Sequence, residues 1–135
     1  MKIKISRKTV AELKIAQIKS SKAEKKEKSE TLKITINNQL FLNTKNSKLF
    51  RIRYLVNLTL ENNATFDLVY DFDFSADEDV EAETLGGTTD VRSHAPAMAW
   101  PYIKGYLENI TAMSGLGSIN LPFFDFIAEP LEVAE

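Results

Sequence analysis

The sequence contains no cysteine and only one histidine, His94. Without cysteine there is no disulfide framework, no Cys-based zinc site and no thiol nucleophile. A lone histidine lacks the partners that a catalytic triad or a histidine metal site needs, so we interpret His94 as a loop residue. No convergent acid–base pair is recognisable elsewhere. We therefore expect neither an enzyme nor a bound metal or cofactor.

Long apolar runs are also absent, since none approaches the roughly 18 residues that a membrane helix needs. The N-terminus is rich in lysine, but no unbroken apolar segment follows it, so we expect no cleaved signal peptide. The chain has 135 residues, of which 44% are hydrophobic, enough for one core and too few for two. We expect a single domain over residues 1–135, cytoplasmic and without membrane insertion.

Two loop motifs resemble ligand sites only in part. The acidic run at 77–83 has the spacing of the start of a calcium loop, but Ala82 and Thr88 stand where that loop needs Gly and Glu. The glycine pair at 86–87 lacks the lysine and the strand–loop–helix context of a phosphate loop. We interpret residues 75–95 as an acidic and glycine-rich crossover loop.

The net charge of −2 hides a strong asymmetry between the two halves. Residues 1–53 carry 15 Lys/Arg against 4 Asp/Glu, whereas residues 54–135 carry 2 against 15. A basic half can indicate nucleic-acid binding, but these lysines are scattered over predicted strands and a Lys/Glu linker without interleaved aromatics. We expect no nucleic-acid partner, and we attribute the asymmetry to attraction between the halves, within or between subunits.

The middle of the chain alternates with period two, because from Leu32 to Phe74 the apolar residues fall mostly on even numbers. This pattern predicts strands with one buried face, which is typical of an antiparallel sheet. Directly opposed residues must share a face, so a three-residue hairpin at 61–63 fixes the register. That register places Leu58 opposite Phe66, Val56 opposite Leu68 and Tyr54 opposite Tyr70. The turn at 43–49 places Leu42 opposite Phe50.

The flanking regions are less regular. We predict a strand near Leu13–Ile18 and a charged, mobile linker over 19–31. From Ala97 to Met113 apolar residues recur at three and four positions, which predicts an amphipathic helix. Pro96 or Pro101 would lie in its first turn, and Ser114-Gly115 would end it.

The segment from His94 to Phe126 resembles SecB-type export chaperones. The stretch HAPAMAWPY at 94–102 is similar to the segment where those proteins begin their long helix, and ITAMSGLG at 110–117 is similar to its end. The stretch INLPFFDF at 119–126 resembles the family's apolar-Asn-Leu…Asn-Phe-Asp signature. The order of predicted elements agrees over roughly residues 32–127.

This resemblance implies an α+β fold: a four-stranded antiparallel sheet backed by one long helix, with the second helix short or absent. It also implies a homo-oligomer built as a dimer of dimers. The implied interface is Leu68, Tyr70, Phe72, Met98, Tyr102, Tyr106 and Ile110. A strand face that contacts the SecA motor in SecB corresponds here to Asp67, Val69, Asp71 and Asp73. The Cys/His tail that some members dock on SecA is missing, which puts coupling to SecA in question.

The implied function is a cytoplasmic holding chaperone that binds unfolded polypeptides and delivers them to export. The alternative is a dedicated chaperone or adaptor for one partner, such as an antitoxin of a toxin–antitoxin system. Apolar residues outside the regular core pattern are the predicted client-binding set: Phe41, Leu55, Val69, Trp100, Phe123, Phe124 and Phe126. The three phenylalanines at 123–126 have an equally good interpretation as core residues. A small ligand-binding domain or enzyme is a third class, which a buried polar cavity would favour.

Overall fold

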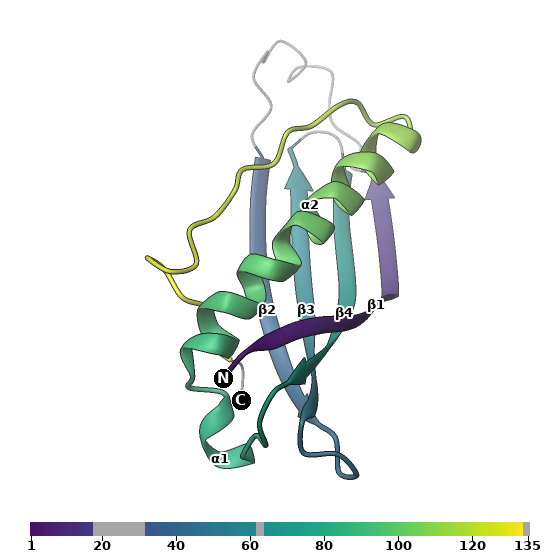
Figure 1. Cartoon of the computed structure of the whole chain (residues 1–135). Coiled ribbons are helices and arrows are strands. Elements are labelled where there is room, and N and C mark those ends of the chain that lie inside the picture. Colours follow the sequence, from purple (N-terminus) through teal and green to yellow (C-terminus); the bar gives the residue numbers. More distant parts are fainter. Residues whose placement is uncertain (18–31, 62–63, 134–135) are drawn as a thin grey trace.

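The computed structural model describes residues 1–17, 32–61 and 64–133. Four strands, β1 (Ile3–Gln17), β2 (Leu32–Leu42), β3 (Leu49–Leu60) and β4 (Ala64–Ala76), form one antiparallel sheet in the order β1-β4-β3-β2 (Figure 1). The predicted linker at 19–31 lies outside the described residues. The fold class predicted from the sequence is confirmed.

The predicted register of β2, β3 and β4 is confirmed. Leu58 pairs with Phe66, Val56 with Leu68, Tyr54 with Tyr70, and Leu42 with Phe50. Every even-numbered residue of β3 and β4 is buried, while their odd-numbered neighbours are partly or fully exposed, with the exception of the buried Asp71. We call the buried side of the sheet the inner face and the odd-numbered side the outer face.

Strand β1 is much longer than the predicted strand near Leu13–Ile18. It pairs with β4 from Ile3 to Gln17, with bulges between Ile5 and Arg7 and between Val10 and Glu12. Each bulge inserts one residue and so shifts the alternation by one position. The inward-facing residues of β1 are therefore odd-numbered, then even-numbered between the two bulges, then odd-numbered again. A search for a constant period of two does not detect such a strand.

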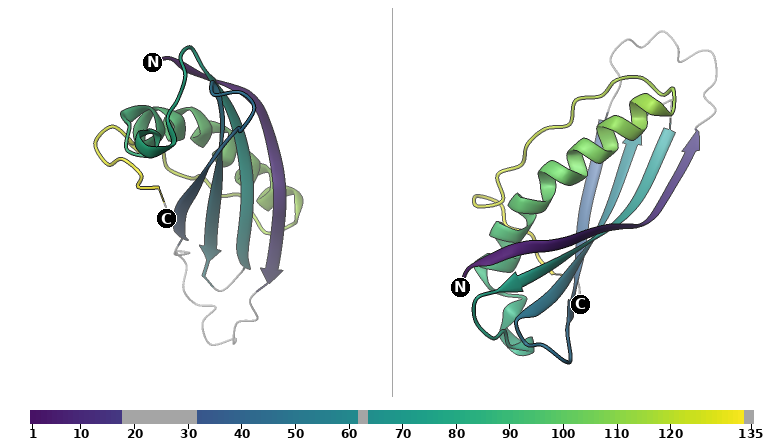
Figure 2. Two further views of the ribbon diagram at one scale, coloured as in Figure 1. Left: turned by 90° about the horizontal axis from the view of Figure 1, so that it is seen from below. Right: turned by 45° about the vertical axis from the view of Figure 1, so that its right-hand side comes forward.

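One long helix, α2 (Ala95–Met113), crosses the inner face diagonally (Figure 2). It is preceded by the short helix α1 (Ala82–Leu85) and the wide helical turn η2 (Asp90–His94), so the crossover expected as a loop is partly helical. Pro96 lies in the first turn as predicted, whereas Pro101 lies inside the helix. Within the part of the chain that the structure describes, no helix is long and apolar enough to cross a membrane.

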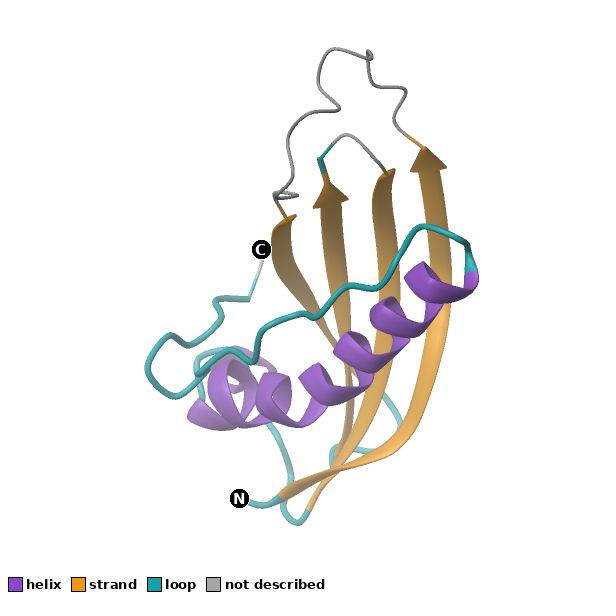
Figure 3. Cartoon of the chain, turned by 90° about the horizontal axis from the view of Figure 1, so that it is seen from above, coloured by secondary structure: helices purple, strands orange, loops and turns teal. Residues whose placement is uncertain are grey.

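The end of α2 reverses the chain. Leu116 N–H donates to the Thr111 carbonyl at 3.1 Å, Gly115 N–H donates to the Ala112 carbonyl at 3.2 Å, and Gly115 has a φ of 76°. This Schellman arrangement confirms the predicted stop. Residues 118–125 then run back beside α2 on the same side of the sheet (Figure 3). Residues 114–133 form no further regular helix.

Candidate partner-binding surfaces

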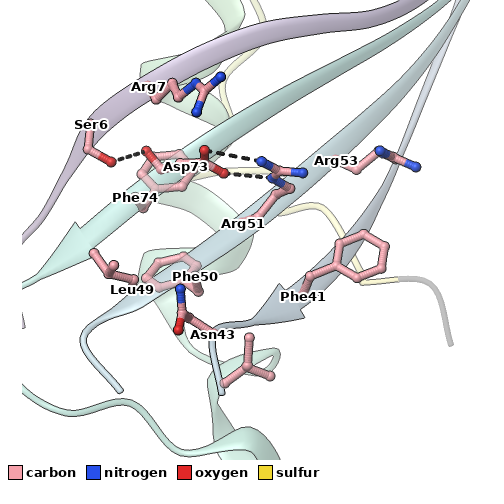
Figure 4. Close-up of a pocket in the computed structure, with 11 residues that line it drawn as sticks. Ser6, Arg7, Phe41, Asn43, Leu49, Phe50, Arg51, Arg53, Asp73 and Phe74 are labelled. Atoms are coloured by element: carbon pink, nitrogen blue, oxygen red, sulfur yellow. Dashed lines mark hydrogen bonds and ion pairs between the residues drawn. The ribbon is translucent and has the colours of Figure 1, made fainter. Parts of the chain in front are cut away.

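The outer face carries a hollow of about 620 Å³ near the turn between β2 and β3 (Figure 4). All four strands line it. Phe41, Arg51, Asp73 and Arg7 lie in one cross-strand row on its floor, because Phe41 pairs with Arg51, Arg51 with Asp73, and Arg7 with Asp73. The hollow therefore places charged and apolar side chains side by side.

Arginines of β3 neutralise the central carboxylates of β4. Arg53 donates two hydrogen bonds to Asp71, at 2.8 and 3.0 Å, and Arg51 donates two to Asp73, at 2.7 and 3.3 Å. Arg51 also lies 3.5 Å from Asp71, which is only 4% exposed. Hydrogen bonding to these carboxylates raises the pKa of both guanidinium groups. The two pairs are charge-assisted and bidentate, the strongest geometry for such contacts.

The predicted acidic motor-binding face is therefore not a row of free carboxylates. Asp71 and Asp73 are paired as described, and Asp67 accepts a hydrogen bond from Asn57 at 2.6 Å. Val69, which lies between Asp67 and Asp71 on this face, is half-buried. The physical reason is the register itself, which sets each arginine opposite an aspartate. A cationic partner would have to compete with arginines already in place.

Arg7 is the unpaired cation of the hollow. It stands directly opposite Asp73 in the register, but both Asp73 carboxylate oxygens accept hydrogen bonds from Arg51. The bulge at Ser6 displaces the strand, and Ser6 Oγ donates to the Asp73 carbonyl at 3.1 Å. Among the described residues the Arg7 side chain has no hydrogen bond or ion pair, and it is exposed. Bulges often redirect side chains in this way at functional sites.

Apolar side chains occupy the β2 end of the hollow. Phe41 is 45% exposed and its ring lies 5.7 Å from the guanidinium carbon of Arg53. Leu42, the next residue, pairs with Phe50 and so belongs to the inner face, but at 37% exposed it lines the rim of the hollow. The structure thus places Phe41 on the outer face as predicted. Leu55 and Val69 oppose each other in the middle of that face and are half-buried.

The segment after α2 is fixed to the helix by polar contacts. Trp100 Nε1 donates to the Pro122 carbonyl at 2.8 Å, and Leu121 N–H donates to Glu108 Oε2 at 2.7 Å. Lys104 pairs with Glu108 at 3.0 Å. Burial opposes the charge of Glu108, but the hydrogen bond from Leu121 and the pairing with Lys104 outweigh it, so its pKa is lowered.

The aromatic residues of this region divide into core and surface. Trp100 and Phe126 are 2% and 5% exposed, so we withdraw them from the predicted client-binding set, because neither offers side-chain surface to a partner. Phe124 is half-buried between their rings, with centroids 4.9 Å from Trp100 and 5.9 Å from Phe126. Phe123 is 73% exposed, with Lys104 Nζ 4.8 Å from its ring centroid.

A smaller groove of about 280 Å³ lies between β2 and the C-terminal segment. Ile34 and Ile36 line one side, and Phe124 and Leu131 line the other. Arg92 fastens the segment, since its Nε donates to the Leu131 carbonyl at 3.1 Å and its own carbonyl accepts from Leu131 N–H at 2.9 Å. No pattern in the sequence links Arg92 to Leu131, and sequence reasoning missed this groove.

The predicted oligomer interface also divides into two sets. Leu68, Tyr70 and Phe72 are buried beneath α2 within this chain, so they belong to its own core. The helix members remain available: Tyr102 is exposed, and Met98, Tyr106 and Ile110 are half-buried. They lie beside the buried stripe of Ala99, Ile103 and Leu107. An interface on α2 would use this flank. Among the described residues no cluster of three or more His, Asp or Glu could hold a metal ion.

No protein-family model and no curated protein sequence matches the chain. Solved structures do match. One is the SecB-like chaperone Rv1957 of Mycobacterium tuberculosis, determined in complex with a ChAD peptide from the Rv1956 HigA1 antitoxin. Its TM-score is 0.71 at 17% sequence identity, and the match covers 90% of this chain and 87% of that one. The chain has the SecB-like fold. A second match is weaker, a protein of unknown function from Streptococcus agalactiae with a TM-score of 0.58 at 13% identity, over 91% of this chain and 98% of that one.

Proposed function

We propose that the chain is a cytoplasmic SecB-like chaperone that holds unfolded polypeptides. The observation that carries the proposal is the outer hollow, where the exposed ring of Phe41 lies beside Arg51, Arg53 and Arg7 and Leu42 lines the rim. A holding chaperone needs apolar surface that an unfolded chain can reach, and it needs no catalytic group. The SecB-like fold supports the same proposal.

A dedicated adaptor for a single partner is the second candidate. It is favoured by the similar chaperone that was solved with an antitoxin peptide. The two candidates differ in breadth, because a general chaperone suppresses aggregation of unrelated clients and an adaptor binds one sequence. Delivery to export through SecA stays an expectation from the resemblance, and two carboxylates of the face that it would use, Asp73 and Asp71, are paired with Arg51 and Arg53.

Oligomerisation through the exposed flank of α2 is part of the proposal. Tyr102, Met98 and Tyr106 present aromatic and thioether surface there, which is the composition typical of interface cores. Several hollows on one oligomer would let weak contacts add up along a single unfolded client. The proposed assembly is a homo-oligomer, such as the dimer of dimers expected from the resemblance.

Light scattering coupled to gel filtration tests the proposal. The purified protein is run alone and with reduced, alkylated lactalbumin, which is permanently unfolded. We expect an oligomer that gains client mass. The double variant Phe41→Ser/Leu42→Ser should lose client binding and keep its oligomeric mass, while Met113→Ser, an exposed control remote from the hollow, should keep both. A monomer that ignores the client would contradict the proposal.

A further inference from the structure

The cross-strand row in the outer hollow has opposite chemistry at its two ends. In its middle, Arg51 and Asp73 neutralise each other through two hydrogen bonds. At the β1 end stands Arg7, a cation that has no side-chain partner among the described residues. At the β2 end stands the exposed ring of Phe41. Because Arg53 is likewise matched by Asp71, Arg7 sets the sign of the charge that the hollow presents.

The distance between the two ends follows from the strand order. Arg7 and Phe41 lie on the two edge strands, with β4 and β3 between them. Neighbouring strands are about 4.8 Å apart, so the row spans roughly 14 Å. An extended peptide advances about 3.3 Å per residue and covers that distance in about four residues. Residues four apart on an extended chain also point to the same side, so one peptide can reach both ends.

We propose that this hollow selects extended peptide segments in which a carboxylate lies four residues from an aromatic or large aliphatic side chain. The carboxylate pairs with Arg7, and the apolar side chain packs on the exposed ring of Phe41. The inference deepens the proposed function, on which it rests, by naming the class of client sequence. Segments with a basic residue in the same place are disfavoured, because Arg7 repels them.

Three fluorescein-labelled peptides of twelve residues test the proposal by fluorescence anisotropy. They share one Phe in a Gly/Ser background and carry Glu, Gln or Lys four residues from it. A charge-assisted hydrogen bond predicts about tenfold tighter binding of the Glu peptide than of the Gln peptide, and the weakest binding for the Lys peptide. Raising the salt from 50 to 500 mM should reduce this difference.

Variants of β1 assign the preference to Arg7. Arg7→Gln should abolish the difference between the Glu and Gln peptides, and Arg7→Lys should retain most of it. Lys14→Gln is the matched control: Lys14 lies on the same face of β1 at the other end, paired with Glu12, and its loss removes the same charge. Because Arg7 has no side-chain partner within residues 1–17, 32–61 and 64–133, its variants should melt at the wild-type temperature.

The outcomes separate this inference from the proposed function. Equal affinities for the three peptides, or tightest binding of the Lys peptide, would overturn the inference while binding of unfolded lactalbumin still supports the function. Failure to bind either the peptides or lactalbumin would overturn both. A fourth peptide carries Glu directly beside the Phe and should bind more weakly than the peptide with Glu four residues away. Equal affinities of these two peptides would refute the row geometry. A labelled oligo(dT) that binds more tightly than the Glu peptide would reassign the hollow to nucleic acid.

Discussion

The indole N–H of Trp100 donates to the carbonyl of Pro122 at 2.8 Å, which joins the middle of α2 to the chain that returns beside it. Trp100→Phe would keep much of the ring but leave that carbonyl without its donor. We expect a loss of about 1–3 kcal/mol in the free energy of unfolding, measured by urea denaturation. Tyr102→Phe, at an exposed position one residue past Pro101, should change it by less than about 0.5 kcal/mol.

Glu108 should make the stability pH-dependent in acid. Its folded-state pKa is lowered, so the stability it contributes is present above its ordinary value of 4.5 and is lost as the pH falls through the lowered pKa. Glu108→Gln should therefore cost about 1 kcal/mol at pH 7, and little below the folded pKa, because the wild-type group is then also neutral. Urea midpoints from pH 7 to pH 3 would test this, and parallel curves would contradict it.

Asp71 is the most sensitive charge on the outer face. It is almost fully buried, and both Arg51 and Arg53 lie within 3.5 Å. Asp71→Asn should destabilise the fold by about 1–3 kcal/mol, because two partly exposed guanidinium groups lose their shared anion. Asp73→Asn should lower the free energy of unfolding by less, since Asp73 is more exposed and pairs with a single arginine. The reverse order of urea midpoints would argue against this assignment.

Asn38 and Tyr54 are buried polar residues that oppose each other across β2 and β3 on the inner face. Within the described part of the chain, neither the Asn38 amide nor the Tyr54 hydroxyl has a hydrogen-bond partner. Burial raises the pKa of Tyr54, so its phenol stays neutral. Tyr54→Phe should leave the stability unchanged or raise it by up to about 1 kcal/mol. A loss above 1 kcal/mol in thermal unfolding would reveal a bonded hydroxyl.

Two glycines should respond to alanine with opposite sign. A Cβ at Gly115 or at Gly105 would meet no atom within 4 Å, so only backbone preference decides. Gly115 has a left-handed φ of 76°, and Gly115→Ala should cost about 1 kcal/mol. Gly105 lies inside α2, and Gly105→Ala should gain about 0.5–1 kcal/mol. Thermal melts of the two variants should shift in opposite directions.

The register could be predicted because parity leaves few choices once one face is buried. The same register that sets Tyr54 opposite Tyr70 also sets Arg53 opposite Asp71, so the paired charges were implicit in the sequence and were overlooked. Arg7 could not be placed in this way. Two bulges shift the alternation of β1, and a bulge depends on tertiary packing that leaves no local signal.

The region after α2 was harder to resolve from the sequence. Residues 123–127 contain three phenylalanines and one isoleucine that sequence alone does not distinguish, yet Phe126 is buried and Phe123 is exposed. Contacts made far along the chain separate them, such as the hydrogen bonds that Glu108 and Trp100 make to residues 121 and 122. The helix end at Gly115 was predictable, because only glycine adopts its backbone conformation without strain.

The strand order has a consequence for how the chain folds. Strands β2, β3 and β4 follow one another as hairpins, whereas β1 pairs only with β4, joining Ile3 to Ala76 and Gln17 to Ala64. Loop closure over so many residues is slow compared with hairpin formation. Of these four strands, β1 is therefore synthesised first and docks last. Until β4 emerges, the nascent chain carries its own unpaired amphipathic strand, and it is briefly the kind of polypeptide that a chaperone protects.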